Sequence, residues 1–569
     1  MGKNKFLVAV FTMATLTFAA CNNEELPAEV TGNNGNAEVV EGVPTYARLT
    51  VQMDGVKRTR TATETGTADE QNVKNIHVYV FANGLFETST GPSGDVVSNS
   101  TGVFHSEVMK LTSGLKTILV VANKGTDWYP TPTTGTTLAA FQDQLMDMYT
   151  TPGRLAHDVS AVARAGDGYK KLQGMDNPAD NGFLMSNLLS NSSFTLKPGI
   201  SRADAERNDY GSEDPADYNH FKISLYRAAA KLQTTYNDAN ALIYSTTQGD
   251  DLSKVVTVGK LTKPSFTVRN LPQKVYLFQH GSVDSPLMTP LYNATNTNSS
   301  WGDFRIFDEV NAPDIEVVAK NETPNSLYLP ENANAIPVIG NTSYVLVKGV
   351  FEPNRDLVIT DVDNNGNYEY GFKGNSDPIN VFTYSPAWGS VIYAVPASIT
   401  GDQERLKHGI NTTLKTYLVR TGLKAYINSN EKSPVYDGII GRNVYYSIKP
   451  GAKDGIYNTL VISKNIEKDD KSYDATVVET VKYLQYNNGI TYYRINIQDG
   501  TQPENHNLAY SITRNNLYKV NVKSISGIGY PNEGDVTVDP ETPISQKTYM
   551  QAHISVEEWK VVDQDADLN

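Results

Sequence analysis

The C-terminal stretch Met550-Gln551-Ala552-His553-Ile554-Ser555-Val556 alternates apolar and polar side chains residue by residue. This period of two is typical of a β-strand with one buried face. Glu557 and Glu558 break the phase, and the residues beyond them resume it one position out of step, which predicts a β-bulge. The predicted apolar face of this strand consists of Met550, Ala552, Ile554, Val556, Trp559 and Val561.

A second alternating stretch lies near the N-terminus, with an apolar face formed by Ala47, Leu49, Val51 and Met53. It is followed by Lys57-Arg58-Thr59-Arg60-Thr61, a basic spot without periodicity that is typical of an exposed, cleavable loop. Residues 531–543 are rich in Pro, Gly and Asp, which indicates a linker before the C-terminal strand. The sequence therefore predicts that one strand can be cut off and another supplied.

Length and composition restrict the class of protein. A chain of 569 residues exceeds what one hydrophobic core usually organises, so we expect two or more domains. With 39% hydrophobic and 20% charged residues it is soluble and globular. The net charge of -14 and the absence of a long basic block argue against nucleic acid and anionic membranes as partners. The 33 tyrosines, with Gly and Pro punctuating short β-branched runs, favour an all-β fold.

The chain has one cysteine, Cys21, so an intrachain disulfide and a cysteine-clustered metal site are both excluded. Lys3 and Lys5 precede an apolar run over residues 6–20, which ends in small residues directly before Cys21. This pattern is similar to a bacterial lipoprotein signal, in which lipid is attached to the cysteine and cleavage makes it the first residue. The alternative is an ordinary signal peptide followed by an incidental cysteine.

The remaining chain shows further local signals. Strands are predicted at residues 73–81, 117–122, 343–351, 476–486 and 490–497. Asn487-Asn488-Gly489 indicates a hairpin between the last two. Helical spacing predicts one helix over residues 138–148. Arg227 and Lys231 flank a run of small residues, and we expect them on a solvated strand edge.

The strongest candidate for metal chemistry is the segment Asp361-Val362-Asp363-Asn364-Asn365-Gly366. Asp361, Asp363 and Asn365 occupy the first three ligand positions of a calcium loop, but Phe372 stands where its final carboxylate is needed. A tight Asn-Gly hairpin explains the same residues, and we favour it. The histidines lack metal-ligand spacing, and the chain lacks a nucleophile elbow and a phosphate loop. We therefore expect no enzymatic activity and no cofactor.

These features together resemble the fimbrilin superfamily of Bacteroidales type V pili, and in layout the stalk subunit of the short fimbriae of Porphyromonas. The resemblance covers nearly the whole chain. The features occur in the expected order along it, and they are the lipoprotein signal ending at Cys21, the early strand with its arginine, the strand at 73–81, Tyr344-Val345-Leu346-Val347, Arg514-Asn515-Asn516-Leu517-Tyr518 and the terminal strand with Trp559.

The resemblance implies two tandem transthyretin-like β-sandwich domains with long loops and few helices. Together with the loop-rich sequence after residue 280, it divides the chain into a signal peptide (1–20), a lipidated propeptide containing a removable first strand (21–60), two sandwich domains (61–280 and 281–545) and a C-terminal donor strand (546–569). It also implies an acylated, palmitate-bearing lipoprotein at the outer membrane that later joins a surface fimbrium.

In the same resemblance, an arginine-specific surface protease cuts after Arg60 or Arg58, and the vacated groove accepts the C-terminal strand of another subunit. The Arg-Ala-Gly-Asp signature associated with such a cut occurs instead at Arg164. The implied partners are other fimbrilin subunits, anchor and tip subunits, and host proteins or glycans used in adhesion. Two other readings are a tip fimbrilin and a non-polymerising lipoprotein that binds glycan through Trp301 or Trp388; a calcium-dependent hydrolase is a more distant third.

Overall fold

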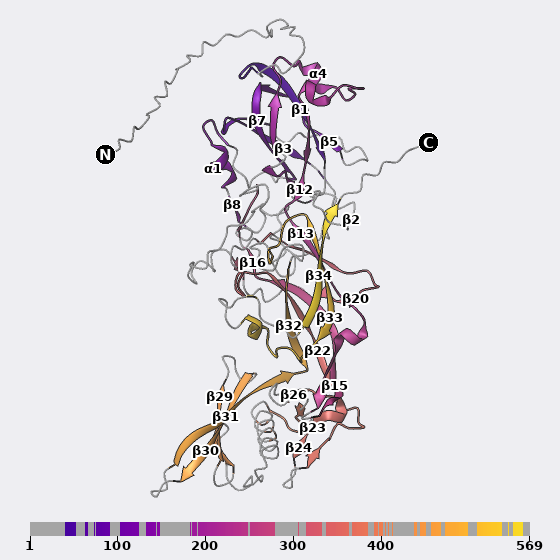
Figure 1. The fold of residues 1–569 in the computed structure, drawn as a ribbon, viewed down its shortest axis with the longest axis vertical. Helices are drawn as coiled ribbons and strands as arrows, with labels where there is room; N and C mark the ends of the chain where they lie inside the picture. The colour runs from indigo at the N-terminus through magenta and orange to yellow at the C-terminus, as the bar shows by residue number, and fades with distance from the viewer. Residues whose placement is uncertain are drawn as a thin grey trace, which may run out of the picture.

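The structure is a computed structural model. It describes residues 40–52, 63–65, 73, 75–90, 103–123, 132–143, 145–147, 183, 185–189, 192–248, 251–272, 274–278, 305–306, 315–329, 331–332, 337–362, 367–384, 392–396, 398–401, 404, 408, 412, 437–440, 444–450, 457–467, 473–498, 509–537, 544 and 550–560. Strands dominate these residues, which confirms the predicted all-β class. The molecule is elongated, with β1, β3 and β7 at one end, β33 and β34 in the middle, and β29 to β31 at the other end (Figure 1).

The first end of the molecule consists of two sheets that share a core. One sheet has the order β11-β1-β5, with β6 also paired to β1, and the other has the order β12-β9-β7-β3-β4, with β10 paired to β7. The strands of the first sheet are β1 (Pro44–Gln52), β5 (Val103–His105), β6 (Met109–Thr112) and β11 (His220–Ser224). Those of the second are β3 (Ile76–Ala82), β4 (Leu85–Thr90), β7 (Gly114–Ala122), β9 (Met185–Ser186), β10 (Ser193–Leu196) and β12 (Tyr226–Arg227).

Successive side chains of β3 and β7 point to opposite faces of their sheet, so this sheet contributes to two hydrophobic cores. Val78 and Val80 face the core shared with β1, whereas Tyr79 and Phe81 face a second, larger core. The second core also holds Phe141 of α1 (Leu138–Gln142), whose ring lies 4.8 Å from that of Tyr79. The predicted helix is therefore shorter than residues 138–148, because β8 (Leu145–Asp147) leaves it to pair with β17 (Lys274–Tyr276).

The middle of the molecule contains two further sheets around this second core. The first has the order β2-β34-β33-β13-β20, with β21 paired to β13, and the second has the order β14-β15-β22-β32, with β19 paired to β15. The first contains β2 (Thr63–Thr65), β13 (Ala230–Tyr236), β20 (Val318–Ala319), β21 (Ser326–Leu329), β33 (Asn516–Ile525) and β34 (Met550–Lys560). The second contains β14 (Ile243–Gln248), β15 (Asp251–Arg269), β19 (Ile315–Glu316), β22 (Tyr344–Pro353) and β32 (Ile490–Asn496).

The far end is built on a sheet of order β23-β27-β26-β31-β30-β29-β28. Its strands are β23 (Val358–Ile359), β26 (Val381–Tyr384), β27 (Ile392–Ala394), β28 (Asp437–Ile440), β29 (Val444–Pro450), β30 (Tyr457–Glu467) and β31 (Tyr473–Asn487). Smaller elements are β16 (Leu271–Pro272) with β18 (Arg305–Ile306), β24 (Asp361–Val362) with β25 (Tyr368–Glu369), α4 (Arg202–Glu206), and the 3-10 turns at Pro215–Tyr218, Ala239–Leu242, Arg355–Leu357 and Glu533–Thr537.

Strand pairing also indicates where the boundary between the two halves of the structure lies along the chain. Both β13 and β15 precede residue 280, but β13 pairs with β33 and β21, and β15 pairs with β22. Residues 230–269 thus complete sheets whose other strands, apart from β2, come from the second half of the chain. In place of the predicted boundary after residue 280, we propose one close to Arg227.

The predicted turn at residues 487–489 forms, but it is not a hairpin turn between paired strands. Asn488 and Gly489 have φ values of 53° and 68°, as a tight Asn-Gly turn requires. Nevertheless β31 pairs with β26 and β30, whereas β32 pairs with β22. Turn chemistry fixes a local reversal of the backbone, and here the two strands continue into different sheets.

Two local predictions about exposure and register are wrong. Arg227 and Lys231 are buried, with 2% and 5% of their surface exposed. Lys231 is buried because β13 lies between β33 and β21 inside its sheet. Arg227 belongs to β12, the end strand of its sheet, and its guanidinium donates to Asn515 Oδ1. In the C-terminal strand, Glu557 and Glu558 stay in register with Leu517 and Asn516. The register shift instead lies between Val522 and Ser524 of the neighbouring strand β33.

Candidate functional site

The predicted removable strand, β1, is an interior strand of its sheet. It pairs in parallel with β11 on one side and antiparallel with β5 and β6 on the other. Ala47, Leu49 and Val51 are all 0% exposed and belong to the core between the two N-terminal sheets. Fully burying an aliphatic side chain is worth about 1.5–3 kcal/mol, so loss of β1 would expose a substantial apolar groove.

The other face of β1 is held by hydrogen bonds rather than by apolar packing. Arg48 Nε donates to the carbonyl oxygen of Ser106 (3.2 Å), and its Nη1 donates to the carbonyl oxygen of Glu206 (2.9 Å) and to Asn208 Oδ1 (2.8 Å). Near the start of the strand, Thr45 Oγ1 donates to the carbonyl oxygen of Lys197 (2.7 Å). The bonds to Lys197, Glu206 and Asn208 tie β1 to the segment that contains α4.

Thr50 lies between two imidazole rings on the same outer face. Its Oγ1 is 2.5 Å from His220 Nε2 and 3.1 Å from His105 Nδ1. Tyr210 Oη lies 2.7 Å from the other nitrogen of His220, Nδ1. Burial, and after it the charge of Arg48, lower the pKa of both imidazoles, and for His220 the pKa falls to about 4. Both rings are therefore neutral near pH 7.

The predicted donor strand, β34, lies against its own chain. It pairs antiparallel with β33 so that Ala552, Ile554 and Val556 stand opposite Val522, Val520 and Tyr518. Met550 is 1% exposed. Trp559 lies in the part of β34 that also pairs in parallel with β2, whereas Val561 lies outside the described residues.

The segment between β1 and β2 connects the predicted removable strand to a short strand that pairs with the predicted donor strand. Residues 53–62 lead from the end of β1 to β2, which pairs with the last residues of β34. This connection contains Met53, Arg58 and Arg60, all outside the described residues. The described part of the chain likewise excludes Cys21, Arg164, Trp301 and Trp388.

The candidate calcium segment forms part of a hairpin. Asp361 pairs with Glu369 and Val362 with Tyr368, while Asp363 and Asn365 lie outside the described residues. Phe372, at the position of the final calcium ligand, is 4% exposed and belongs to the large core. No cluster of three or more His, Cys, Asp or Glu side chains that could hold a metal ion occurs among the described residues.

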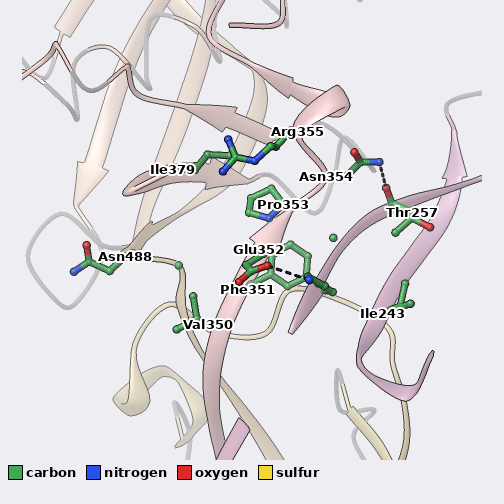
Figure 2. Close-up of a pocket in the computed structure, with 13 residues that line it drawn as sticks. Ile243, Thr257, Val350, Phe351, Glu352, Pro353, Asn354, Arg355, Ile379 and Asn488 are labelled. Carbon is green, nitrogen blue, oxygen red and sulfur yellow. Dashed lines mark hydrogen bonds and ion pairs between the residues drawn. The ribbon is translucent and has the colours of Figure 1, made fainter. Parts of the chain in front are cut away.

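A separate pocket of about 450 Å³ lies between β14, β15, β22 and the turn at Asn488 (Figure 2). Its polar groups bond to one another: Asn354 Nδ2 donates to the carbonyl oxygen of Thr257 (2.9 Å), and Lys260 Nζ lies 3.3 Å from Glu352 Oε2. These contacts hold Asn354, Lys260 and Glu352 against neighbouring residues of the pocket wall. Within the part of the chain that the structure describes, no helix has the length and apolarity needed to cross a membrane.

Sequence reasoning found β1 and β34 but missed His105, His220 and Tyr210. The pattern within one strand reports which face is buried, and it carries no information about side chains on neighbouring strands. Thr50 and His220 are 170 residues apart in the sequence. A search for regular histidine spacing could not have joined them.

Two family models match the chain, one towards each end. Residues 47–227 match the family described as major fimbrial subunit protein (FimA), and residues 484–565 match the family described as major fimbrial subunit protein type IV, fimbrillin, C-terminal. The first match begins within β1, and the second contains β34. No curated protein matches the chain.

Solved structures with weak similarity include a fimbrilin from Porphyromonas gingivalis, at 12% identity and a TM-score of 0.34, covering 91% of this chain and 99% of that one. Another is the tip fimbrial protein Mfa3 of Porphyromonas gingivalis, at 11% identity and a TM-score of 0.29, covering 90% of this chain and 100% of the truncated protein. A protein assigned to cell adhesion from Parabacteroides distasonis reaches 12% identity and a TM-score of 0.40, covering 92% and 99%.

These structural likenesses are too weak to carry an argument, so the similarity to fimbrial proteins rests on the two family matches. They occur in the order that the sequence resemblance requires, at the segments that contain the two terminal strands. By these matches, the segments at residues 47–227 and 484–565 are similar to major fimbrial subunit proteins.

Proposed function

We propose that this chain is a stalk subunit of a cell-surface type V pilus, assembled by protease-triggered exchange of β-strands and used in adhesion. The observation that carries the proposal is the position of β1. It is an interior strand with three fully buried side chains, and residues 53–62, with Arg58 and Arg60, follow it directly.

Removing β1 would leave a sheet with unpaired backbone groups along β11, β5 and β6 and an apolar groove beneath them. An extended segment from another molecule satisfies both needs at once. The donor and the acceptor surfaces differ, so the contact is heterologous and propagates as a fibre. The role is therefore structural rather than catalytic.

The proposal assigns the donor role to β34 of a second subunit. In the uncut chain β34 lies towards the outside of its sheet, covered on its far side by β2 only at residues Glu558 to Lys560. A strand in this position can leave without dismantling β33 or β13. The presence of both a removable and a donor strand favours a stalk subunit over a tip subunit.

The proposal includes export as a lipoprotein with lipid on Cys21 at the outer membrane, followed by cleavage after Arg60 or Arg58 by an arginine-specific surface protease. A cut there separates the lipid and β1 from the rest of the chain. Metabolic labelling with a fatty acid tests the first step: wild type should carry label and Cys21→Ala should not. Label retained in Cys21→Ala contradicts the lipoprotein assignment.

Polymerisation is tested by incubating the purified, signal-free protein with an arginine-specific protease, followed by sizing and N-terminal sequencing. Ladders of oligomers are expected after a cut at Arg58 or Arg60. Arg58→Lys with Arg60→Lys should resist the cut and stay monomeric, because the protease does not cleave after lysine. A chain ending at Pro543, and a full-length Ile554→Asp variant, should be cut without forming ladders. Wild-type protein that is cut and remains monomeric overturns the proposal.

A further inference from the structure

The two terminal strands share a five-residue pattern. Residues 47–51 read Ala-Arg-Leu-Thr-Val, and residues 552–556 read Ala-His-Ile-Ser-Val. Both have the same three apolar positions in the order small, large and medium. Both also place a hydroxyl side chain at the fourth position, Thr50 in one and Ser555 in the other.

The buried positions of β1 show why the order matters. Ala47, Leu49 and Val51 are completely buried, and protein interiors are close-packed, so the size of each side chain matters. Ala552, Ile554 and Val556 reproduce this sequence of sizes when β34 runs in the same direction as β1. The reverse direction places Val556 in the site of Ala47, where its additional methyl groups overpack the core.

The hydroxyl position carries a chain of hydrogen bonds that one neutral form of each imidazole satisfies. With the proton of His105 on Nδ1 and that of His220 also on Nδ1, His105 Nδ1 donates to Thr50 Oγ1, and the Thr50 hydroxyl donates to His220 Nε2. His220 Nδ1 then donates to Tyr210 Oη, whose hydroxyl donates to the carbonyl oxygen of Asp204 (3.3 Å). Thr50 must accept one hydrogen bond and donate another, which a serine or threonine hydroxyl can do.

We propose that His105 and His220 together recognise the hydroxyl of whichever strand occupies this groove: Thr50 before cleavage, and Ser555 of a second copy of this chain afterwards. This inference rests on the proposed function, because it names the register and the specificity residue of the same exchange. Ala552, Ile554 and Val556 then take the places of Ala47, Leu49 and Val51, and the two imidazoles set the register.

The hydroxyl site distinguishes this register from its neighbours. A slip of one residue turns the apolar face of the donor outward. A slip of two keeps the apolar face inward but brings His553 or Glu557 to the imidazoles in place of Ser555. Neither side chain has a hydroxyl, so neither can both accept a hydrogen bond from His105 and donate one to His220 as a hydroxyl does. A slip of two residues is therefore disfavoured more by the loss of hydrogen bonds at the two imidazoles than by the change in apolar packing.

Disulfide trapping tests the register directly. Tyr46 of β1 stands opposite Lys110 of β6, and the proposed register places Gln551 of the incoming strand at the Tyr46 position. In a full-length Cys21→Ser background, Gln551→Cys combined with Lys110→Cys should form disulfide-linked ladders after proteolysis and mild oxidation. His553→Cys with Lys110→Cys, two residues out of register, is the matched control and should cross-link at least about tenfold more slowly. Equal cross-linking, or stronger cross-linking of the control, overturns the register.

Substitution of Ser555 tests the hydroxyl itself in the full-length chain. Ser555→Ala and Ser555→Val should slow ladder formation by roughly tenfold, as expected for a lost hydrogen bond that leaves buried partners unsatisfied. Ser555→Thr should assemble at the wild-type rate, because it restores the hydroxyl that Thr50 supplied. Equal rates for all four chains overturn the role of the hydroxyl.

A double substitution separates recognition from general damage to the strand. In a His220→Leu background the hydroxyl has lost one partner, so Ser555→Ala should slow assembly less than it does in the presence of His220. Thermal unfolding of each uncut chain shows whether it is folded, and the cross-linking pair tests the register without altering either histidine. Wild-type protein that is cut and forms no ladder refutes the proposed function. Wild-type ladders with no effect at Ser555 and no register preference refute only this inference.

Discussion

Arg514 Nε lies 2.8 Å from Glu331 Oε2, and both side chains are only 3% exposed. The backbone nitrogen of Arg514 also donates to Glu331 Oε1 (2.7 Å), so the carboxylate holds both the side chain and the main chain before β33. The remaining guanidinium nitrogens donate to Ser186 Oγ (3.1 Å) and to the carbonyl oxygens of Leu277 (3.0 Å) and Tyr276 (2.9 Å). One cation thereby connects β9 of the N-terminal sheets to the entry of β33 in the middle of the molecule.

Breaking this pair by one substitution is expected to destabilise the uncut chain strongly. Glu331→Gln leaves the buried guanidinium without its counter-charge, and removal of one partner of a buried pair costs about 3–5 kcal/mol. The midpoint of urea unfolding is the measurement. The control is Lys260→Ala, since its pair with Glu352 has side chains that are 60% and 52% exposed and contributes at most about 1 kcal/mol. Similar losses for the two variants contradict the structural role of Arg514.

Shortening a side chain under β1 is expected to weaken the uncut chain. Leu49→Ala opens a cavity in the core between the N-terminal sheets, and such changes cost about 2–5 kcal/mol. Leu85→Ala, at a position that is 49% exposed, is the control and should change stability by about 0.5 kcal/mol or less. The two variants are compared by thermal unfolding before any cleavage. A neutral Leu49→Ala is incompatible with β1 as a fully packed interior strand.

Acid should weaken the attachment of β1. Burial, then the charges of Arg48 and His105, lower the pKa of His220 to about 4 from its ordinary 6.5. The unfolded chain therefore binds a proton at a higher pH than the folded chain does. The folded chain loses stability as the pH falls from about 6.5 towards 4, and the loss from this residue levels off below about 4.

The measurement is the unfolding temperature of the uncut chain between pH 7.5 and pH 4.5. The wild-type temperature should fall over this range, and His220→Gln should fall less because the amide does not titrate. Arg48, His105 and Tyr210 face the ring and remain in both proteins. Parallel curves for the two proteins exclude His220 as a source of the pH dependence.

The turn between β31 and β32 should not tolerate a side chain at Gly489. A Cβ atom there would lie 2.7 Å from the carbonyl oxygen of Phe351, and the residue has a φ of 68°. We expect Gly489→Ala to cost at least about 2 kcal/mol, from backbone strain and from overpacking. Gly374→Ala is the control, because its φ of 74° is similar but nothing lies within 4 Å of the added atom. Equal unfolding temperatures for the two variants contradict the close approach.

The sequence predicted the strands with a regular pattern well. Ala47, Leu49 and Val51 lie on one face of a strand, and the structure buries all three in the core. Such predictions succeed because the pleat alternates side chains whatever the neighbouring strands are. The same reasoning predicted an apolar face for β34.

Predictions that depended on which strands lie next to one another were less successful. Arg227 and Lys231 read as an exposed edge because charged residues flank small ones, but Arg227 Nη1 donates to Asn515 Oδ1 (3.0 Å), a residue far along the chain. The turn at Asn488 and Gly489 was found, yet not the sheets to which its two strands belong. Position within a sheet is a property of distant segments, and local pattern does not contain it.

The parallel pairing of β13 with β33 has a consequence for how this chain is made. Thr235 and Asn521 are partners in that pairing although 286 residues separate them. Contacts between residues so far apart in the sequence form slowly, because the entropy cost of closing a large loop comes before the contacts stabilise the chain. The sheet that contains β13 and β33 therefore cannot be completed during synthesis until nearly the whole polypeptide exists, and β13 remains without this neighbour until then.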